Sequence, residues 1–412
     1  MNLENETSAK RASEIVEAQP LLGPYTFGSL VLPNRIVMSP MTRGRTDSSD
    51  RAPGDVEAEY YTQRASAGLI ITGGTYVSPQ AVGGIRVPGI YSDSQVEAWK
   101  RLTGAVHARD GRIFVQLAHS GSISHPDLLA GEVPVAPSAI NPQHKVFTHS
   151  GFKDTVTPRS LSVDDIQSIV DDFGKAAKNA KVAGFDGVEL HSANIYLLPQ
   201  FLNSATNLRD DEYGGSPERR ARLIIEILGA IAGHWLRSQV GIKLSPGQNG
   251  VGVLVANDDT LPTYDYLIQQ LDQFALGYLH LMRPINDVSR SVVAVLQEGT
   301  YKRYRPIFQR TLIANSGFEL ESANEVVRSG NADLVSFAKH FIANPDLPER
   351  FSRNVPIAEG DRDTYYQGGA AGYISYPSYA TSLWRFGKAG QRANSHDRTD
   401  HLNDICPLGP GI

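Results

Sequence analysis

The sequence predicts a single-domain (β/α)8 barrel, or TIM barrel, of the α/β class, and three observations lead to this prediction. Eight short apolar runs rich in branched residues are spaced along the 412 residues. Helical patterns lie between many of these runs, an alternation typical of the barrel. The competing doubly wound sheet favours a glycine fingerprint after its first strand, and "RIVMSPMTRGRT" contains none.

The apolar runs give the predicted strands in chain order. These are Arg35–Pro40, Leu69–Gly74, Arg112–Leu117, Gly187–His191, Val240–Ser245, Tyr278–Met282, Thr311–Gly317 and Asp333–Lys339. A long helix is predicted over Ser162–Gly184, with Ser162 as its N-cap and Gly184 as its C-terminal stop. Another helix is predicted over Ser322–Ala332.

Two segments are too long to be simple connections. Ser120–Leu161 follows the third strand and is rich in Pro, Ser and His, so we expect it to cap the top of the barrel. The chain after the eighth strand ends in a polar stretch. We therefore predict an N-terminal extension (residues 1–20), the barrel (residues 21–385) and an extended C-terminal tail (residues 386–412).

The composition excludes several kinds of protein. The single cysteine, Cys406, rules out an intrachain disulfide and a cysteine-ligated zinc or iron–sulfur site. The net charge of −5 comes without a basic patch for nucleic acid. The chain shows neither a secretory signal nor a run of about 18 apolar residues that would span a membrane. We expect a cytoplasmic protein that binds neither nucleic acid nor membrane.

Barrel enzymes carry their active sites at the C-terminal ends of the strands. The candidate site residues at these ends are Pro40, Met41, Thr42, Gly74, Gln116, His191, Asn194, Tyr196, Lys243, Ser316, Gly317, Ala338 and Lys339. A phosphate is bound by bare backbone N–H groups and a positive charge. Gly317 after the seventh strand offers the first, and Lys339 after the eighth offers the second. The alternative is that these are ordinary turn glycines and surface lysines.

The residues at the end of the fourth strand indicate a second function for the barrel mouth, beside phosphate binding. His191 and Asn194 both offer hydrogen-bond donors that can polarise a carbonyl group. Tyr196 can give up a proton, since an unperturbed phenol has a pKa of about 10. The alternative is a hydrogen-bonded barrel histidine beside a packing aromatic. The motif lacks the second His and the Glu of a helical zinc site, so we expect no metal.

Several longer motifs occur in a characteristic order. The longest is "HSANIYLLPQFLNSATNLRDDEYGGSPERRARLIIEI", which begins at His191. The others are "LPNRIVMSPMTR", "YYTQRASAGLIIT", "FVQLAHSG", "HFIANPDLPERF" and "DTYYQGGAAGYISYP". With these motifs the chain resembles the Old Yellow Enzyme family of FMN-dependent ene-reductases from about Leu21 to Pro377.

The resemblance implies that FMN lies across the barrel mouth. The implied FMN contacts are Pro40, Met41, Thr42, Gly74, Gln116 and Lys243 at the ring, and Ser316, Gly317, Ala338 and Lys339 at the phosphate. His191 and Asn194 are implied to bind the carbonyl or nitro oxygen of the substrate. Tyr196 is implied to protonate the α-carbon as hydride reaches the β-carbon, and Tyr366 to wall the pocket.

The same resemblance implies NADPH or NADH as the reductant, entering the substrate pocket itself. It implies enones and nitroalkenes as substrates, and a monomer or homodimer. One alternative is a specialised family member that reduces or isomerises a single metabolite. Another is a non-catalytic barrel that binds a phosphorylated ligand.

This chain also departs from the family pattern. Relatives usually carry Arg at the positions of Lys243 and Lys339, and lysine keeps the charge but loses the planar two-pronged donor. Thr42 places the chain outside the branch that carries Cys there. Ala118 stands where a bulky aromatic is common, so we expect a wider pocket. The polar loop Asn207–Arg222 we interpret as structural, with its carboxylates and arginines pinning the long connection after the fourth strand.

Overall fold

The computed structural model describes residues 19–250 and 253–380, and within them eight parallel strands close into a barrel. The barrel strands are β3 (Ile36–Met38), β4 (Leu69–Tyr76), β5 (Ile113–Ala118), β10 (Gly187–Ser192), β11 (Val240–Leu244), β12 (Tyr278–Met282), β13 (Thr311–Asn315) and β14 (Leu334–Phe337). Each predicted strand overlaps one of these, although several bounds differ. The last strand pairs with the first, β14 with β3, which closes the ring and confirms the predicted fold class.

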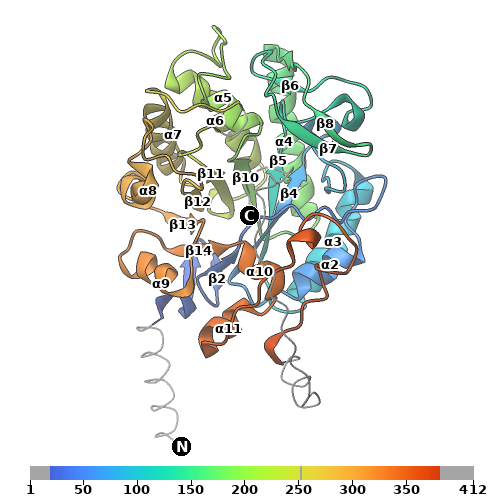
Figure 1. Cartoon of the computed structure of the whole chain (residues 1–412), viewed down its shortest axis with the longest axis vertical. Coiled ribbons are helices and arrows are strands. Elements are labelled where there is room, and N and C mark those ends of the chain that lie inside the picture. Colours follow the sequence, from blue (N-terminus) through green and yellow to red (C-terminus); the bar gives the residue numbers. More distant parts are fainter. Residues whose placement is uncertain (1–18, 251–252, 381–412) are drawn as a thin grey trace, which may run out of the picture.

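Helices surround the barrel strands (Figure 1). They are α2 (Asp55–Thr62), α3 (Asp93–His107), α4 (Val163–Val182), α5 (Leu197–Leu202), α6 (Pro217–Ala232), α7 (Thr260–Phe274), α8 (Leu296–Tyr304), α9 (Leu320–Arg328), α10 (Lys339–Ala343) and α11 (Leu347–Arg353). Short 3-10 helices cover Pro20–Leu22, Pro79–Ala81, Pro126–Leu128, Arg237–Gln239 and Arg362–Thr364.

The ends of α4 follow from the predicted capping residues. The Ser162 hydroxyl accepts a hydrogen bond from the Asp165 backbone N–H at 3.1 Å. The Asp165 carboxylate in turn accepts one from the Ser162 N–H at 2.8 Å, which completes a capping box. Gly184 has φ +82° directly after the helix, a conformation that glycine adopts without steric cost. The predicted start and stop of this helix are confirmed.

An antiparallel hairpin closes the N-terminal end of the barrel. It consists of β1 (Tyr25–Phe27) and β2 (Leu30–Leu32), whose Phe27 and Leu32 are buried among inward-facing barrel residues. The Phe27 ring packs edge-on against Phe114 and Tyr278, with centroid distances of 6.3 and 6.0 Å. The barrel therefore has an apolar floor, and its polar interior lies toward the opposite, C-terminal end.

The segment after the third barrel strand folds against the top of the barrel. It contains β6 (Val135–Ala136) paired with β9 (Arg159–Ser160), and a hairpin of β7 (Lys145–Thr148) and β8 (Gly151–Asp154), grouped beside β5 in Figure 1. Val146 of the hairpin is buried in a cluster with Ile123, Ile195 and Leu254, against which Tyr196 packs. The predicted capping segment is thus in contact with a candidate site residue.

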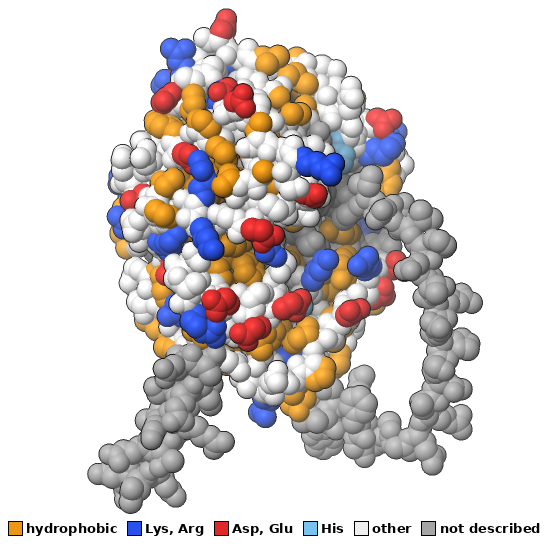
Figure 2. Space-filling view, turned by 60° about the vertical axis from the view of Figure 1, so that its left-hand side comes forward, with side chains coloured by type: hydrophobic (Ala, Val, Ile, Leu, Met, Phe, Trp, Pro, Cys, Tyr) orange, Lys and Arg blue, Asp and Glu red, His pale blue; other side chains and the backbone are white. Residues whose placement is uncertain are grey.

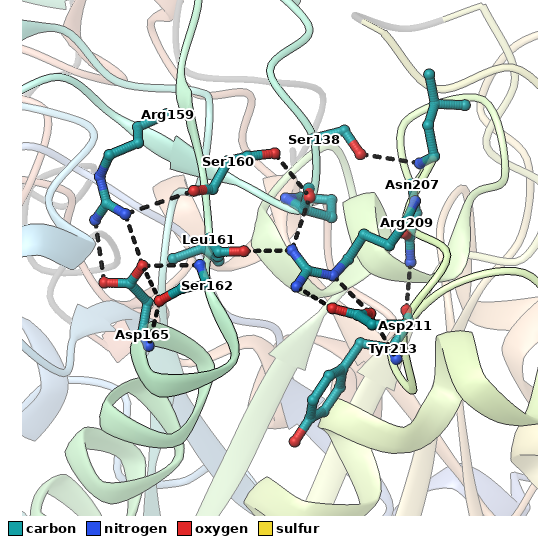
Figure 3. A network of polar contacts seen from close by, with 12 residues as sticks. Ser138, Arg159, Ser160, Leu161, Ser162, Asp165, Asn207, Arg209, Asp211 and Tyr213 are labelled. Carbon is teal, nitrogen blue, oxygen red and sulfur yellow. Dashed lines mark hydrogen bonds and ion pairs between the residues drawn. The ribbon is translucent and has the colours of Figure 1, made fainter.

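The polar loop after the fourth barrel strand is tied to this capping segment. Arg209 is 9% exposed at its side chain and pairs with Asp211. Its guanidinium also donates to the carbonyl oxygen of Pro137, at 3.1 Å, and to that of Leu161 (Figure 3). The loop is structural, as predicted, but its reach was underestimated: it anchors the connection after the third strand as well as its own.

The described surface mixes charges of both signs. Figure 2 shows basic and acidic side chains interspersed over the face in view. Among the described residues no helix is long and apolar enough to cross a membrane. Within residues 19–250 and 253–380, no cluster of three or more His, Cys, Asp and Glu is arranged to hold a metal ion. The predicted C-terminal tail, residues 386–412, lies outside the described residues.

Candidate active site

A cavity of about 380 Å³ opens at the C-terminal ends of β12, β13 and β14. Ser316, Gly317, Ala338 and Lys339, which we predicted to hold a phosphate, all line it. The two strands end earlier than predicted, at Asn315 and Phe337, so Ser316, Gly317 and Ala338 lie in bends and Lys339 begins α10. Ser316 and Gly317 have φ of +88° and +66°. A positive φ at Ser316 is unusual for a residue other than glycine and often marks a functional position.

The same cavity holds an arginine that sequence reasoning missed. Arg283 directly follows β12 and donates from Nη2 to the Gly317 carbonyl oxygen at 3.0 Å. Its guanidinium carbon lies 5.3 Å from the centre of the Phe318 ring. The rule that barrel sites gather at strand ends applies to this strand too, and it would have found Arg283.

The candidate ring-binding residues meet at the mouth beside this cavity. Gly74 is in register with Gln116, and a Cβ placed on Gly74 would point toward Gln116 Oε1 and His191 Cδ2, 3.6 and 3.8 Å away. A Cβ on Gly73 would lie 2.4 Å from the Met41 carbonyl oxygen, so the turn after β3 lies against β4. The structure thus brings together site residues from four strands, β3, β4, β5 and β10.

A chain of buried hydrogen bonds crosses the barrel beneath the mouth. Gln116 Nε2 donates to Glu189 Oε1 at 2.8 Å, and His280 Nδ1 lies 2.9 Å from Glu189 Oε2. His280 Nε2 lies 2.8 Å from Ser336 Oγ, which accepts from Asn315 Nδ2 at 2.8 Å. Glu189 and His280 are completely buried. Sequence reasoning missed both, although Glu189 lies two residues before His191 on the same strand and His280 is the polar residue of the otherwise apolar strand β12.

In this chain of hydrogen bonds, the negative charge lies on the carboxylate of Glu189. Burial alone would raise the pKa of Glu189, but His280, Lys243 and the Gln116 amide outweigh burial and hold that pKa below its ordinary value. Burial lowers the pKa of His280. The neutral His280 ring therefore donates from Nδ1 to an ionised carboxylate and accepts from the Ser336 hydroxyl.

Lys243, one of the candidate ring-binding residues, is a buried cation. Register places it beside His191 on one neighbouring strand and His280 on the other, and it is 3% exposed. Burial lowers the pKa of Lys243 to about 8, while the charge of Glu189 opposes that shift. Its ammonium group makes no hydrogen bond or ion pair with another described residue, which leaves its donors available to a ligand.

The predicted substrate-binding residues follow β10. Burial, with Lys243 adding to it, lowers the pKa of His191 to about 3, so the ring is neutral at physiological pH. His191 Nδ1 and Asn194 Oδ1 are buried without a partner among the described residues. Asn194 has φ +60°, and its backbone N–H donates to Ser245 Oγ at 2.8 Å. The Tyr196 ring meets that of His191 edge-on, with a centroid distance of 5.1 Å.

Tyr366 lies in a C-terminal segment that packs on the turn after β3. Buried Arg43 donates to the Tyr365 and Gly372 carbonyl oxygens at 2.8 and 2.9 Å. Buried Arg45 donates to carbonyl oxygens of the same segment, including that of Gly369 at 3.2 Å. These bonds hold Tyr366 next to the turn that carries Thr42.

Comparison with known proteins identifies this arrangement. Residues 20–357 match the NADH:flavin oxidoreductase / NADH oxidase family. The structure of the old yellow enzyme homologue from Zymomonas mobilis matches with a TM-score of 0.82 and 36% identity, over 87% of this chain and 99% of that one. The chain belongs to the Old Yellow Enzyme family.

Two further similarities within the Old Yellow Enzyme family bear on the chemistry. Morphinone reductase in complex with tetrahydroNAD matches with a TM-score of 0.81 and 40% identity, over 92% of this chain and 99% of that one. A putative 12-oxophytodienoate reductase 2 of Oryza sativa subsp. japonica is 40% identical, over 88% of this chain and 94% of its own length. The predicted class, an FMN-dependent NAD(P)H oxidoreductase acting on carbon–carbon double bonds, is confirmed.

The described residues of this Old Yellow Enzyme fit FMN. The cavity at the end of β13 and β14 offers a cation, Lys339, beside a sharp turn for the phosphate. At the mouth, Lys243 is a buried cation without a partner among the described residues, and Gly74 leaves open the space that a side chain would fill. Lys243 and Gln116 would meet the polar edge of the ring, and Ser316 with Lys339 the phosphate.

Proposed function

We propose that this Old Yellow Enzyme reduces α,β-unsaturated aldehydes, ketones and nitroalkenes with either NADPH or NADH. The observation that carries the proposal is a neutral, buried His191 with an unpartnered ring nitrogen, beside Asn194 and Tyr196 at the mouth that fits the flavin ring. FMN, when bound, supplies hydride transfer between the reduced nicotinamide and the β-carbon of the substrate.

His191 and Asn194 bind the carbonyl or nitro oxygen of the substrate. A neutral imidazole donates a hydrogen bond without adding a positive charge, so it polarises the substrate without holding an anion too tightly. The low pKa of His191 keeps this state across the physiological range. Hydrogen bonds at this oxygen withdraw electrons from the double bond and favour hydride arrival at the β-carbon.

Tyr196 protonates the α-carbon. It forms the N-cap position of α5, so its backbone is fixed where the mouth meets the capping segment. Its ring packs against the cluster of Val146, Ile195 and Leu254, which excludes water from one side of the phenol. A phenol with an ordinary pKa of about 10 carries its proton at neutral pH and can deliver it to the α-carbon.

The test separates the two half-reactions. The visible flavin band of the holoprotein is followed without oxygen, first on adding NADPH and then on adding cyclohexenone. Tyr196→Phe should leave bleaching by NADPH unchanged and slow reoxidation by cyclohexenone roughly 10²–10⁴-fold, the scale of a lost general acid. Tyr266→Phe, on the outer helix α7, is the matched control and should change neither step. Equal slowing of both steps would show that Tyr196 is not the proton donor.

A further inference from the structure

Arg283 stands in the phosphate cavity on the other side of the Ser316–Gly317 turn from Lys339. The order of the barrel strands sets this arrangement, because β12, β13 and β14 are neighbours. Arg283 follows β12, the Ser316–Gly317 turn follows β13, and Lys339 comes shortly after β14. Both cations line the same cavity of about 380 Å³. The turn between them is therefore flanked by positive charge on two sides.

The charge of the cavity wall favours an anion. Arg283 and Lys339 form no ion pair with any described residue. The one carboxylate in the described lining is Glu319, and its Oε2 lies 3.1 Å from Nε2 of His340, which also lines the cavity. Glu319 thus has a partner of its own, and the two cations remain available.

We propose that Arg283 is a second cationic ligand of the FMN phosphate, acting together with Lys339 and the turn between them. The assignment rests on the flavin cofactor of the proposed function, and it adds a residue from a third strand end to the phosphate site. It makes the loop after β12 part of the cofactor site.

The local geometry prepares the Arg283 guanidinium for this role. One of its five N–H groups is bound to the Gly317 carbonyl oxygen, and the others have no partner among the described residues. The Phe318 ring under the guanidinium fixes its plane. A Cβ on Gly317 would lie 2.6 Å from Arg283 Nη2, so glycine at this position lets the guanidinium approach the turn. A planar guanidinium can then offer two parallel donors to one phosphate.

The experiment compares FMN with riboflavin, which lacks the phosphate. Flavin is removed from the purified protein, and the quenching of added flavin fluorescence gives the dissociation constant of each ligand. Arg283→Met keeps an apolar chain of similar length over Phe318. It should weaken FMN binding on the order of 10- to 100-fold, as expected for one or two charge-assisted hydrogen bonds, and leave riboflavin binding unchanged.

Two further variants make the result specific. Arg290→Met removes an equal charge from an exposed position of the same loop, and should change neither dissociation constant. Arg283→Lys should recover part of the FMN affinity, because it restores the charge without the fork. Lys339→Met should likewise weaken FMN alone.

Each result decides between the possibilities. Equal weakening of FMN and riboflavin by Arg283→Met would mean that the arginine only supports the Gly317 turn, and would overturn the assignment. Unchanged binding of both flavins would overturn it as well, while leaving the cofactor in place. Wild-type protein that binds neither flavin would instead refute the cofactor itself and, with it, the proposed function.

Discussion

Replacing Gly44 with alanine should loosen the C-terminal segment that carries Tyr366. Gly44 lies in the turn after β3 with φ +60°, and a Cβ there would lie 2.7 Å from the Tyr366 carbonyl oxygen. Cβ atoms do not approach backbone oxygen this closely, so one of the two segments must move. The carbonyl groups that would move with Tyr366 are those bound by Arg43 and Arg45.

Two contributions to the loss of stability can be separated. The left-handed backbone costs any residue other than glycine about 1–2 kcal/mol. Displacing the C-terminal segment breaks or stretches at least one hydrogen bond from a buried guanidinium, which adds about 1.5–3 kcal/mol. Gly330→Ala is the matched control, since Gly330 has φ +72° and a Cβ added there would meet no described atom within 4 Å. Gly330→Ala should therefore show only the cost of the left-handed backbone.

Urea unfolding of both variants measures the difference directly. We expect Gly44→Ala to be less stable than Gly330→Ala by about 2 kcal/mol. Limited trypsin digestion should also cut faster after exposed Arg362 in Gly44→Ala, because the segment no longer lies fixed on the turn. Equal unfolding free energies, within about 0.5 kcal/mol, and equal cleavage rates would refute the reasoning.

Two further predictions concern charge. The pKa of Lys243 is near 8 in the folded apoprotein and about 10.5 when unfolded, so the cost of burying its charge is full below pH 8 and fades as the pH rises toward 10.5. Lys243→Met should therefore stabilise the apoprotein at pH 7, with a gain in unfolding free energy that shrinks between pH 8 and 10; a gain independent of pH would contradict the assigned pKa. Arg209→Ala should lower the free energy of unfolding by about 2 kcal/mol, because it removes hydrogen bonds that join two loops. The control Arg222→Ala breaks an exposed ion pair with Glu226 and should lower it by about 0.5 kcal/mol or less. Equal urea midpoints for the two variants would show that Arg209 does not link the loops.

The barrel could be predicted because its strands are short, branched and buried on both faces, so each stands out as an apolar run. Their ends were harder to place. The seventh strand was expected to reach Gly317 and stops at Asn315, because the positive φ of Ser316 turns the chain out of the sheet. The helix expected over Ser322–Ala332 covers Leu320–Arg328, since Glu319 caps it earlier.

What the sequence does not show is which groups become partners across long distances. Arg43 and Arg45 bind backbone carbonyls, which every residue carries, so no side-chain pattern identifies their partners. Glu189 and His280 lie 91 residues apart in the sequence, and only the barrel brings them within hydrogen-bond distance. Arg283 is a different case, because it directly follows the sixth predicted strand and the strand-end rule was not applied there.

The bonds from Arg43 and Arg45 to the C-terminal segment also impose an order on biosynthesis. The partners of these arginines lie about 320 residues later in the chain, and β3 itself pairs with β14. At a ribosomal rate of roughly 5–20 residues per second, the turn that carries Thr42 waits roughly 15–65 s for the groups that complete it. Because β14 and the carbonyl groups bound by Arg43 and Arg45 are synthesised so late, the barrel cannot close and the flavin site cannot be completed until most of the chain has been made.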